Sequence, residues 1–386
     1  MKLTVVIVSY NVKHYIEQCI VSVQQAARGI DHDIIVVDNA SSDDTVGYLR
    51  QRFAQGVTIV ESMHNLGFAR ANNIAINQSQ SQYVLLLNPD TFISEDCLNT
   101  VIAFMDEHPR AGAAAAQMHN ADGTLAPESR HALPTPWVSL LKMLGFSRRY
   151  YMSHLSWHQP NPIEVVSGAF MMLRREALDS VGLLDEDFFM YGEDIDLSYR
   201  IVKGGYQNWY IPATIVHYKG ESTQKSSFRY VHVFYQAMLI FFRKHYGHLS
   251  FLVTLPVKLA IYFRAFIALL QMLWQRMRAS LGFYDRPAGD AAYLFVGTPA
   301  MLDQCRELSR RKGLTAAFLD VADLDALDSR LGAATCVVYD IDTLSFAQVI
   351  SHAAALTQSH PDIGTCSLTR QLIITPSEVI PITLDT

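Results

Sequence analysis

The chain has 386 residues, enough for two domains or for one large domain with an appendage. Half of the residues are apolar and 18% are charged, so we expect a sizeable core and not a disordered chain. The formal net charge of -6 argues against nucleic acid as the main partner, because nucleic-acid-binding proteins usually carry a basic excess. Five scattered cysteines without a C-x-x-C pair are typical of reduced thiols in the cytosol.

The first third of the chain alternates apolar runs with helical stretches. The runs at 3–8, 33–37, 57–61 and 83–87 predict strands, and 12–27 predicts a helix. The first run stops at Ser9 without a small-residue cleavage site, so it predicts a buried strand and not a signal peptide. Short apolar strands separated by helices indicate an α/β fold with a mostly parallel sheet covered on both faces. Ligands of such sheets bind at the carboxyl ends of the strands.

Residues 229–286 have a different character. They carry eight Lys and Arg against one acid, a charge of +7, which leaves -13 for the rest of the chain. From residue 251 onwards the longest uncharged run, 265–275, is shorter than the roughly 20 apolar residues that cross a bilayer. The polar residues of this stretch, Arg264, Gln271, Gln275 and Arg278, fall on one helical face opposite a broad apolar surface. We expect this helix to lie on an anionic membrane surface, or else to pack on the rest of the chain or in a homo-oligomer.

A second, smaller α/β unit is predicted after residue 287. Apolar runs at 293–296, 315–319 and 336–339 predict strands, and 301–312 predicts a helix. The turn at 297–299 lacks the G-x-G-x-x-G pattern of a phosphate-binding loop.

Asn88-Pro89-Asp90 directly follows one of the predicted buried strands. A carboxylate with a second oxygen ligand two residues earlier can hold Mg²⁺ or Mn²⁺, which binds one or two carboxylates together with phosphate oxygens. Taken alone, the triplet is more often an ordinary turn.

A second group of acids surrounds Glu193-Asp194-Ile195-Asp196, with Asp185 and Asp187 just upstream. A carboxylate beside a sugar can act as the general base that removes a proton from an acceptor hydroxyl. Acids at the start of a helix are equally favoured by the helix dipole, so both interpretations stand.

Two single residues complete the candidates. Asp38 ends the second predicted strand, where its carboxylate can accept the imide N–H of uracil or thymine, although helix capping is the commoner role. His217 follows a third apolar run and is either structural or a metal ligand.

The order of these segments resembles the family 2 glycosyltransferases of the GT-A fold, and most closely the rhamnosyltransferase-like branch. The resemblance covers about residues 1–245. It is carried by Val6-Ile7-Val8-Ser9-Tyr10-Asn11, Val37-Asp38-Asn39-Ala40-Ser41-Ser42-Asp43-Asp44-Thr45, Asn65-Leu66-Gly67-Phe68-Ala69-Arg70-Ala71-Asn72-Asn73, Asn88-Pro89-Asp90, Ser167-Gly168-Ala169, Gly192-Glu193-Asp194-Ile195-Asp196-Leu197 and His217.

The resemblance implies a role for each matching residue. The nucleoside pocket would be lined by Ser9, Asn11 and Asp38, with Arg70 near the diphosphate. Asn88 and Asp90 stand at the family's metal motif, and His217 stands at its later metal ligand. Gly168 would lie beside the donor and acceptor sugars. Asp194, of the pair Glu193-Asp194, would be the base of an inverting in-line displacement.

Two departures from the family pattern matter. Asn88 replaces the first Asp of the metal motif, which leaves the metal affinity and the choice between Mg²⁺ and Mn²⁺ open. No Q-x-x-R-W follows the Glu-Asp pair, so we expect a non-processive enzyme.

Other classes of protein fit less well. A nucleotidyltransferase needs a glycine-rich loop after the first strand, and an oxidoreductase needs G-x-G-x-x-G there, whereas this chain has Ser9-Tyr10-Asn11. A non-catalytic nucleotide-sugar or carbohydrate binding protein is the alternative.

The expected reaction is transfer from a UDP- or dTDP-sugar, with rhamnose favoured by the resemblance. The expected acceptor is a saccharide or a polyprenyl-diphosphate-linked saccharide, as in surface-polysaccharide assembly. The expected location is cytoplasmic, on the inner face of the cell membrane. The predicted division is a catalytic domain at 1–228, the basic helical segment at 229–286, and an accessory domain at 287–386.

Overall fold

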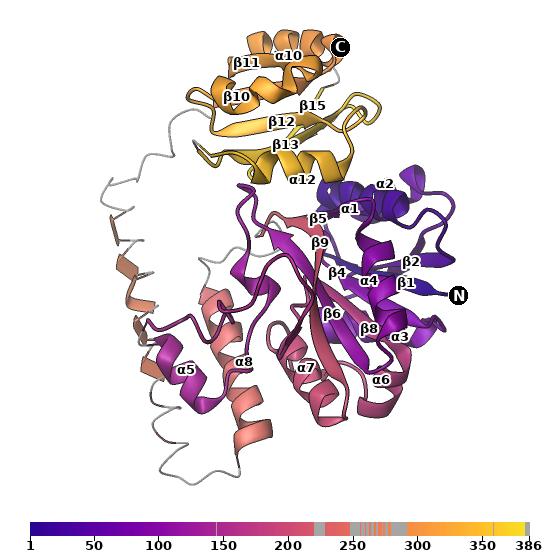
Figure 1. Ribbon diagram of the computed structural model, residues 1–386, viewed down its shortest axis with the longest axis vertical. Helices are drawn as coiled ribbons and strands as arrows, with labels where there is room; N and C mark the ends of the chain where they lie inside the picture. Colours follow the sequence, from indigo (N-terminus) through magenta and orange to yellow (C-terminus); the bar gives the residue numbers. More distant parts are fainter. Residues whose placement is uncertain are drawn as a thin grey trace.

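The structure is a computed structural model that describes residues 1–143, 145–219, 228–247, 292–357 and 359–382, with single residues between 255 and 278. Two β-sheets, each flanked by helices, lie one above the other (Figure 1). The first sheet has nine strands in the order β3-β2-β1-β4-β8-β6-β9-β5, with β7 paired to β9. The second has six, in the order β11-β10-β12-β13-β14-β15.

The elements of the first unit alternate along the chain. Its strands are β1 (Leu3–Ser9), β2 (His32–Asp38), β3 (Thr58–Glu61), β4 (Tyr83–Leu87), β5 (Thr91–Ile93), β6 (Ala111–His119), β7 (Asn161–Ile163), β8 (Phe170–Arg174) and β9 (Gln207–His217). Its helices are α1 (Lys13–Ala26), α2 (Thr45–Arg52), α3 (Phe68–Gln78), α4 (Cys97–Glu107), α5 (Pro136–Met143), α6 (Arg175–Val181), α7 (Glu193–Lys203) and α8 (Phe228–Tyr246).

The alternation of side chains along the strands builds two cores. In β1, Leu3, Val5 and Ile7 pack with α1 and α4, whereas Val6 faces the other side with α3 and α7. Strands β1 to β4 are parallel to one another, and β8 runs antiparallel between β4 and β6. The predicted α/β class is confirmed, and the sheet is mixed beyond β4.

The second unit begins with four parallel strands. Its elements are β10 (Ala292–Gly297), α10 (Pro299–Lys312), β11 (Thr315–Asp320), α11 (Leu327–Arg330), β12 (Cys336–Asp340), α12 (Phe346–Ala354), β13 (Asp362–Ser367), β14 (Leu372–Ile374) and β15 (Val379–Pro381). The last two strands add antiparallel pairs at the edge of the sheet.

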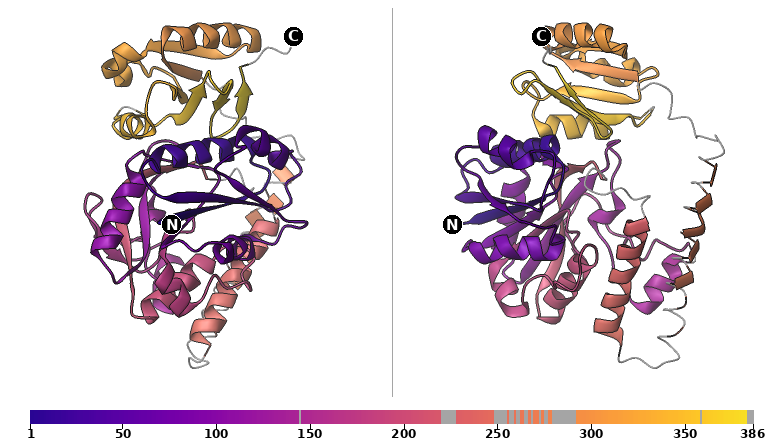
Figure 2. Two further views of the ribbon diagram at one scale, coloured as in Figure 1. Left: turned by 90° about the vertical axis from the view of Figure 1, so that its right-hand side faces the viewer. Right: turned by 180° about the vertical axis from the view of Figure 1, so that it is seen from behind.

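The two units share a buried interface (Figure 2). Phe92 of β5 packs against Phe346 of α12, with ring centroids 5.1 Å apart. Glu95 accepts hydrogen bonds from the backbone N–H groups of Phe346 (2.7 Å) and Ala347 (2.9 Å), and so caps α12 from the other unit. A carboxylate at a helix N-terminus is stabilised by the helix dipole, so polar and apolar contacts together hold this interface.

The basic segment is described only in part. Arg264 and Gln275 of its predicted polar stripe lie outside the described residues, and Gln271 and Arg278 are exposed. Eight described apolar side chains between 259 and 277 are 44–63% exposed and follow a helical spacing: Leu259, Tyr262, Phe263, Phe266, Leu270, Leu273, Trp274 and Met277. Ile267 and Leu269, also described, are partly buried. Within the described part of the chain, no helix combines the length and the hydropathy needed to cross a bilayer.

Candidate active site

The carboxyl ends of β1 and β2 bring the predicted nucleoside residues together. Ser9 and Asp38 are partners in the parallel register of these strands, and both are buried. Asn11 has a positive φ of 55°, and its side-chain oxygen accepts a hydrogen bond from the Ser42 backbone N–H at 2.7 Å. This hydrogen bond therefore joins the loop after β1 to the loop after β2.

Among the described residues, only one of the two carboxylate oxygens of Asp38 takes part in a hydrogen bond. Its Oδ2 accepts a hydrogen bond from the Ser41 N–H at 2.9 Å, whereas Oδ1 is buried and has no hydrogen-bond partner among the described residues. The helix that follows, α2, begins after Asp44, and no side chain caps it. Because a buried, unpaired carboxylate oxygen is costly, an imide N–H at this position would be stabilising.

Three predicted metal-site residues converge. Asp90 Oδ1 lies 3.2 Å from His217 Nε2, and the Asn88 side-chain amide lies 3.3 Å from the same nitrogen. The antiparallel pairing of Thr91 with His217 creates this proximity, since it joins the end of β9 to the turn after β4.

This donor set fits a divalent cation that is also bound by substrate. Mg²⁺ and Mn²⁺ take one or two carboxylates and complete their shells with phosphate oxygens and water. An Asn amide can present its oxygen as a further ligand. Across the described residues no group of three or more His, Cys, Asp and Glu side chains is gathered in a way that would hold a metal by itself.

Asp194 stands at the start of α7, opposite the start of β8. Its Oδ2 accepts a hydrogen bond from the Gly168 N–H at 3.1 Å, and its Oδ1 accepts one from the Ile195 N–H at 2.8 Å. Burial raises the pKa of this carboxyl, and the backbone hydrogen bonds oppose that rise. A carboxylate oriented by two backbone donors and raised in basicity is suited to accept a proton.

Glu193, the neighbour of Asp194, is 5% exposed, and its Oε2 has no hydrogen-bond partner in the described part of the chain. Burial, followed by the charge of Asp194, raises its pKa well above the usual value. The protonated form of Glu193 is thus favoured beside a charged Asp194.

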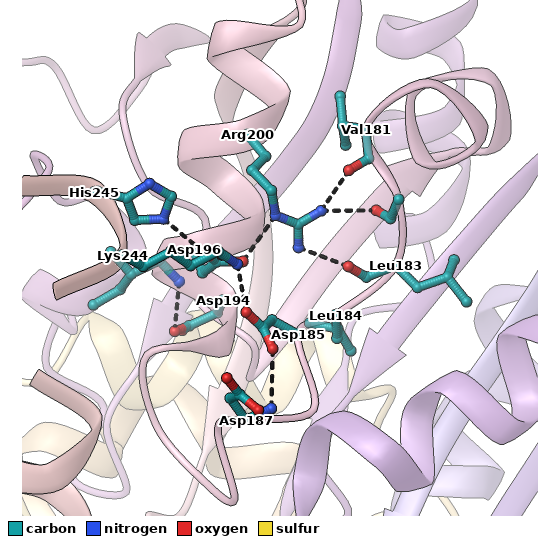
Figure 3. Close-up of polar contacts among 12 residues, drawn as sticks. Val181, Leu183, Leu184, Asp185, Asp187, Asp194, Asp196, Arg200, Lys244 and His245 are labelled. Atoms are coloured by element: carbon teal, nitrogen blue, oxygen red, sulfur yellow. Dashed lines mark hydrogen bonds and ion pairs between the residues drawn. The ribbon is translucent and has the colours of Figure 1, made fainter. Parts of the chain in front are cut away.

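Asp196 serves a different purpose, as Figure 3 shows. Its fully buried carboxylate is paired with Arg200 at 2.8 Å, with Lys244 at 2.8 Å and with His245 at 2.6 Å. Lys244 also pairs with Asp185. Because two cations and the His245 imidazole occupy the carboxylate, Asp196 fastens α8 to α7 and is poorly placed to act as a base.

Arg70 lies near the start of α3, whose first residue, Phe68, has its ring beside Gly168. Arg70 Nε donates to Glu186 at 2.8 Å, and its side chain is 56% exposed. Gly67 has φ of 81°, and a Cβ there would lie 2.3 Å from the Phe189 carbonyl oxygen, so the close approach requires glycine. The placement of Arg70 near a diphosphate remains a prediction.

A cluster that the sequence analysis missed lies beyond Asp194. Lys142 of α5 places its Nζ 3.3 Å from the centroid of the Tyr150 ring, and His131 stacks on the same ring at 5.4 Å. Lys219 is paired with Glu128 at 3.0 Å nearby. No sequence pattern marks these residues, because they come from separate segments of the chain.

Comparison with known proteins relates the N-terminal part of the chain to the glycosyltransferases. Residues 4–182 match the model described as Glycosyl transferase family 2, and this part of the chain is a domain of that family.

The curated relatives include rhamnosyltransferases. The chain is 27% identical over 258 residues to N-acetylglucosaminyl-diphospho-decaprenol L-rhamnosyltransferase of Mycobacterium tuberculosis, covering 62% of this chain and 83% of the relative. It is 26% identical over 249 residues to Rhamnosyltransferase WbbL of Escherichia coli (strain K12), covering 59% and 91%. The resemblance to the rhamnosyltransferase-like branch is confirmed.

Among solved structures, the chain is similar to a mannosyltransferase of Pyrobaculum calidifontis in complex with GDP-Man and Mn²⁺. The identity is 18%, the coverage is 81% of each chain, and the TM-score is 0.46. A structure of GalNAc-T7 with UDP, GalNAc and Mn²⁺ has the same TM-score at 17% identity, over 60% of this chain and 47% of the other. Likenesses of this strength place no individual residue.

Proposed function

We propose that this family 2 glycosyltransferase is an inverting, non-processive enzyme that transfers a sugar, rhamnose in the first instance, to a hydroxyl of a lipid-linked saccharide. The observation that carries the proposal is the position of Asp194. Its carboxylate is held by the Gly168 and Ile195 N–H groups, and burial increases its basicity. A binding protein has no need of such a group.

In the proposed reaction, the acceptor hydroxyl gives its proton to Asp194 while its oxygen attacks the anomeric carbon of the donor sugar. The bond between that carbon and the leaving diphosphate breaks on the opposite face, so the configuration inverts. Gly168 contributes by its lack of a side chain and by its N–H. A Cβ there would contact the Phe68 ring at 3.4 Å and Asp194 Cβ at 3.6 Å, so glycine keeps the space beside the base open.

Asp90 and His217, with Asn88 beside them, would hold the divalent cation. When bound, Mg²⁺ or Mn²⁺ supplies positive charge that stabilises the departing diphosphate. Asp90 is 2% exposed, so its charge is screened little by water. This setting increases its attraction for a cation.

The donor is proposed to be a dTDP- or UDP-sugar, because Asp38 Oδ1 is positioned as an acceptor without a donor. A pyrimidine N3–H would satisfy this oxygen. The rhamnosyltransferase relatives favour dTDP-rhamnose.

The acceptor is proposed to be linked to a polyprenyl diphosphate at the inner face of the cell membrane. The M. tuberculosis relative is named for a sugar on diphospho-decaprenol, which is an acceptor of this class. The exposed apolar residues between 259 and 277 would lie in the membrane interface, as expected for an amphipathic helix without a spanning segment. The proposed domain boundaries lie at 228/229 and 286/287, with 287–386 as an accessory domain.

The test is a transfer assay with a lipid-linked N-acetylglucosaminyl diphosphate and a panel of dTDP-, UDP- and GDP-sugars in Mn²⁺ or Mg²⁺. Product from a dTDP- or UDP-sugar is expected, and the new linkage should have the inverted configuration by NMR. Substituting Asp194 with Asn should abolish product while donor binding persists. Product from GDP-sugars alone would overturn the donor assignment, and undiminished activity of Asp194→Asn would overturn the mechanism.

A further inference from the structure

Lys142 is a half-buried cation without a matching anion. Its ammonium faces the Tyr150 ring at 3.3 Å and the Tyr151 ring at 5.3 Å, and no ion pair to it occurs among the described residues. Burial lowers the pKa of Lys142 to about 8, and only Glu128 opposes that shift. Glu128 itself is paired with Lys219. The cluster therefore has an excess of positive charge.

His131 adds an unused polar group to the same cluster. The residue is 8% exposed, and within the described residues neither ring nitrogen has a hydrogen-bond partner. Burial, followed by the charge of Lys142, lowers its pKa to about 4, so the neutral ring presents one N–H donor and one acceptor. Leaving both nitrogens unpaired in a buried position is costly unless a ligand reaches them.

The cluster is built on fixed backbone. His131 forms an isolated bridge with Val165, through the Val165 N–H and the His131 carbonyl at 3.0 Å. The Ala132 N–H donates to the Tyr150 carbonyl at 2.7 Å, which holds the loop that carries Tyr150 against the same segment. The arrangement is therefore set before any ligand binds.

Its position relates it to the proposed base. Val165 lies three residues before Gly168, whose N–H binds Asp194. Burial, followed by the negative charge of Asp194, raises the pKa of Tyr150, so this ring lies within electrostatic reach of the base. In the sheet order, β1 and β2 with Asp38 lie on one side of β8, and β6, from which the His131 segment leaves, lies on the other. The cluster is thus on the side of Asp194 away from the proposed nucleoside pocket.

The same segment also reaches an apolar surface. Trp137 of α5 is 59% exposed and Phe146 is 66% exposed. Leu133, just before α5, packs with Phe241 of α8. In Figure 1, α5 lies on the same side of the molecule as α8 and the described part of the basic segment. A cationic cluster therefore lies between a base and an apolar surface.

We propose that Lys142 and His131, stacked with Tyr150, form a subsite that binds the diphosphate of the lipid-linked acceptor. This inference rests on the proposed function, and it names the residues that recognise the acceptor. The order along the ligand is the acceptor sugar at Asp194, the diphosphate at Lys142, and the lipid at Trp137 and Phe146. An ammonium and an N–H donor match the oxygens of a diphosphate, and such charge-assisted hydrogen bonds are strong.

The test uses farnesyl diphosphate as the probe and the full chain, with its donor site first saturated by dTDP and Mn²⁺. Isothermal titration should show binding to the wild type. Lys142→Gln should weaken it by about 10- to 100-fold, as expected for the loss of a charged hydrogen bond. Arg148→Gln removes an exposed charge from the same segment and should change the affinity by less than about 2-fold. Farnesol, which lacks the diphosphate, should not distinguish the variants.

Several outcomes would overturn the subsite. They are equal binding by Lys142→Gln and the wild type, equal weakening in Arg148→Gln, and no binding by the wild type. A parallel loss of dTDP affinity in Lys142→Gln would assign Lys142 to the donor diphosphate instead. Binding that depends on Lys142 in a protein that transfers no sugar to lipid-linked acceptors would refute the proposed function and leave the subsite standing.

Discussion

Lys244 of α8 and Asp196 of α7 form a 2.8 Å ion pair in which the carboxylate is fully buried. Arg200 and His245 bind the same carboxylate, so one anion holds two helices together two residues after the proposed base. The helix that leads toward the basic segment is thereby fastened to the helix that carries Asp194. The relationship gives Asp196 a structural role in a motif otherwise proposed to be catalytic.

The first prediction concerns this ion-pair network. Asp196→Asn should lower the free energy of unfolding by about 2–4 kcal/mol, because it removes the buried anion to which the partly exposed Arg200 and Lys244 are paired. Lys244→Met should cost less, about 1–3 kcal/mol, since Arg200 and His245 remain. Urea unfolding at neutral pH measures both. Arg243→Met, at an exposed neighbouring position, is the control and should change stability by less than about 0.5 kcal/mol. Equal free energies of unfolding for all three variants would show that the ion-pair network does not stabilise the fold.

The second prediction separates Asp194 from Glu193. Asp194→Asn should lower kcat by about 10²- to 10⁴-fold, the usual contribution of a general base. Glu193→Gln should retain most of the turnover, because its raised pKa favours the protonated form that glutamine resembles. The reverse pattern in steady-state assays would move the base to Glu193.

The pH dependence of kcat offers a second check on Asp194. Its folded pKa is raised by burial, and the base must be deprotonated to act. Activity should therefore decline as the pH falls through a value above the usual range of an aspartate. A profile that stays flat down to the ordinary aspartate pKa would contradict this.

Some strands can be predicted from the sequence and others cannot. β4 was predicted at 83–87 and spans Tyr83–Leu87, because an apolar run in a buried parallel strand leaves a strong signal. β6 (Ala111–His119) was not predicted. It is rich in alanine, which has low β propensity, and the strand exists because β8 and β9 flank it.

The residues of the candidate site likewise include some that the sequence predicts and some that it does not. Asp38 and Asn88 follow strands that the sequence reveals, so their place at the sheet edge follows from the α/β pattern. The approach of His217 to Asp90 depends on the pairing of β5 with β9, which no local pattern encodes. The role of His217 as a metal ligand was predicted from the resemblance to the family. Lys142 and His131 had no such guide, since long-range packing alone brings them to Tyr150.

The third prediction concerns the metal. Chelation by EDTA should abolish transfer, and Mn²⁺ or Mg²⁺ should restore it. Asp90→Asn and His217→Gln should each weaken Mn²⁺ binding in the presence of dTDP, because each alters one of the three converging residues. Calorimetry measures this binding without turnover. Full activity in the chelator would exclude the cation from the reaction.

The fourth prediction uses His131 as a probe of stability. Its pKa in the folded protein is about 4, against the ordinary 6.5, so the unfolded chain takes up the proton first as the pH falls. The free energy of unfolding should therefore fall between pH 6.5 and 4, by up to about 3 kcal/mol from this residue. Lys142 and Lys219 contribute to the lowered pKa, and Glu128 opposes it.

His131→Phe keeps the stacking on Tyr150 and removes the titrating group. The difference in unfolding free energy between wild type and variant should shrink or reverse toward pH 4. A difference that stays constant between pH 6.5 and 4 would show that His131 is not kept neutral by burial.

The fifth prediction concerns the membrane, and it depends on the exposed apolar residues of the basic segment. Phe263 and Trp274 are 63% and 59% exposed, and the segment carries a charge of +7. An interfacial helix gains from apolar burial and from about 1 kcal/mol per Lys or Arg near an anionic surface. The chain should therefore sediment with anionic vesicles and be released as the salt concentration rises.

Variants distinguish insertion from packing against the rest of the chain. Replacing Lys258, Arg264 and Arg278 with Glu should strongly weaken binding, because it lowers the charge of the segment from +7 to +1. Phe263→Ser with Trp274→Ser should weaken binding without lowering the free energy of unfolding, since neither side chain is covered by the described protein. Loss of stability in the double variant, or a wild-type protein that stays in the supernatant with anionic vesicles at low salt, would mean that the apolar face packs on protein instead.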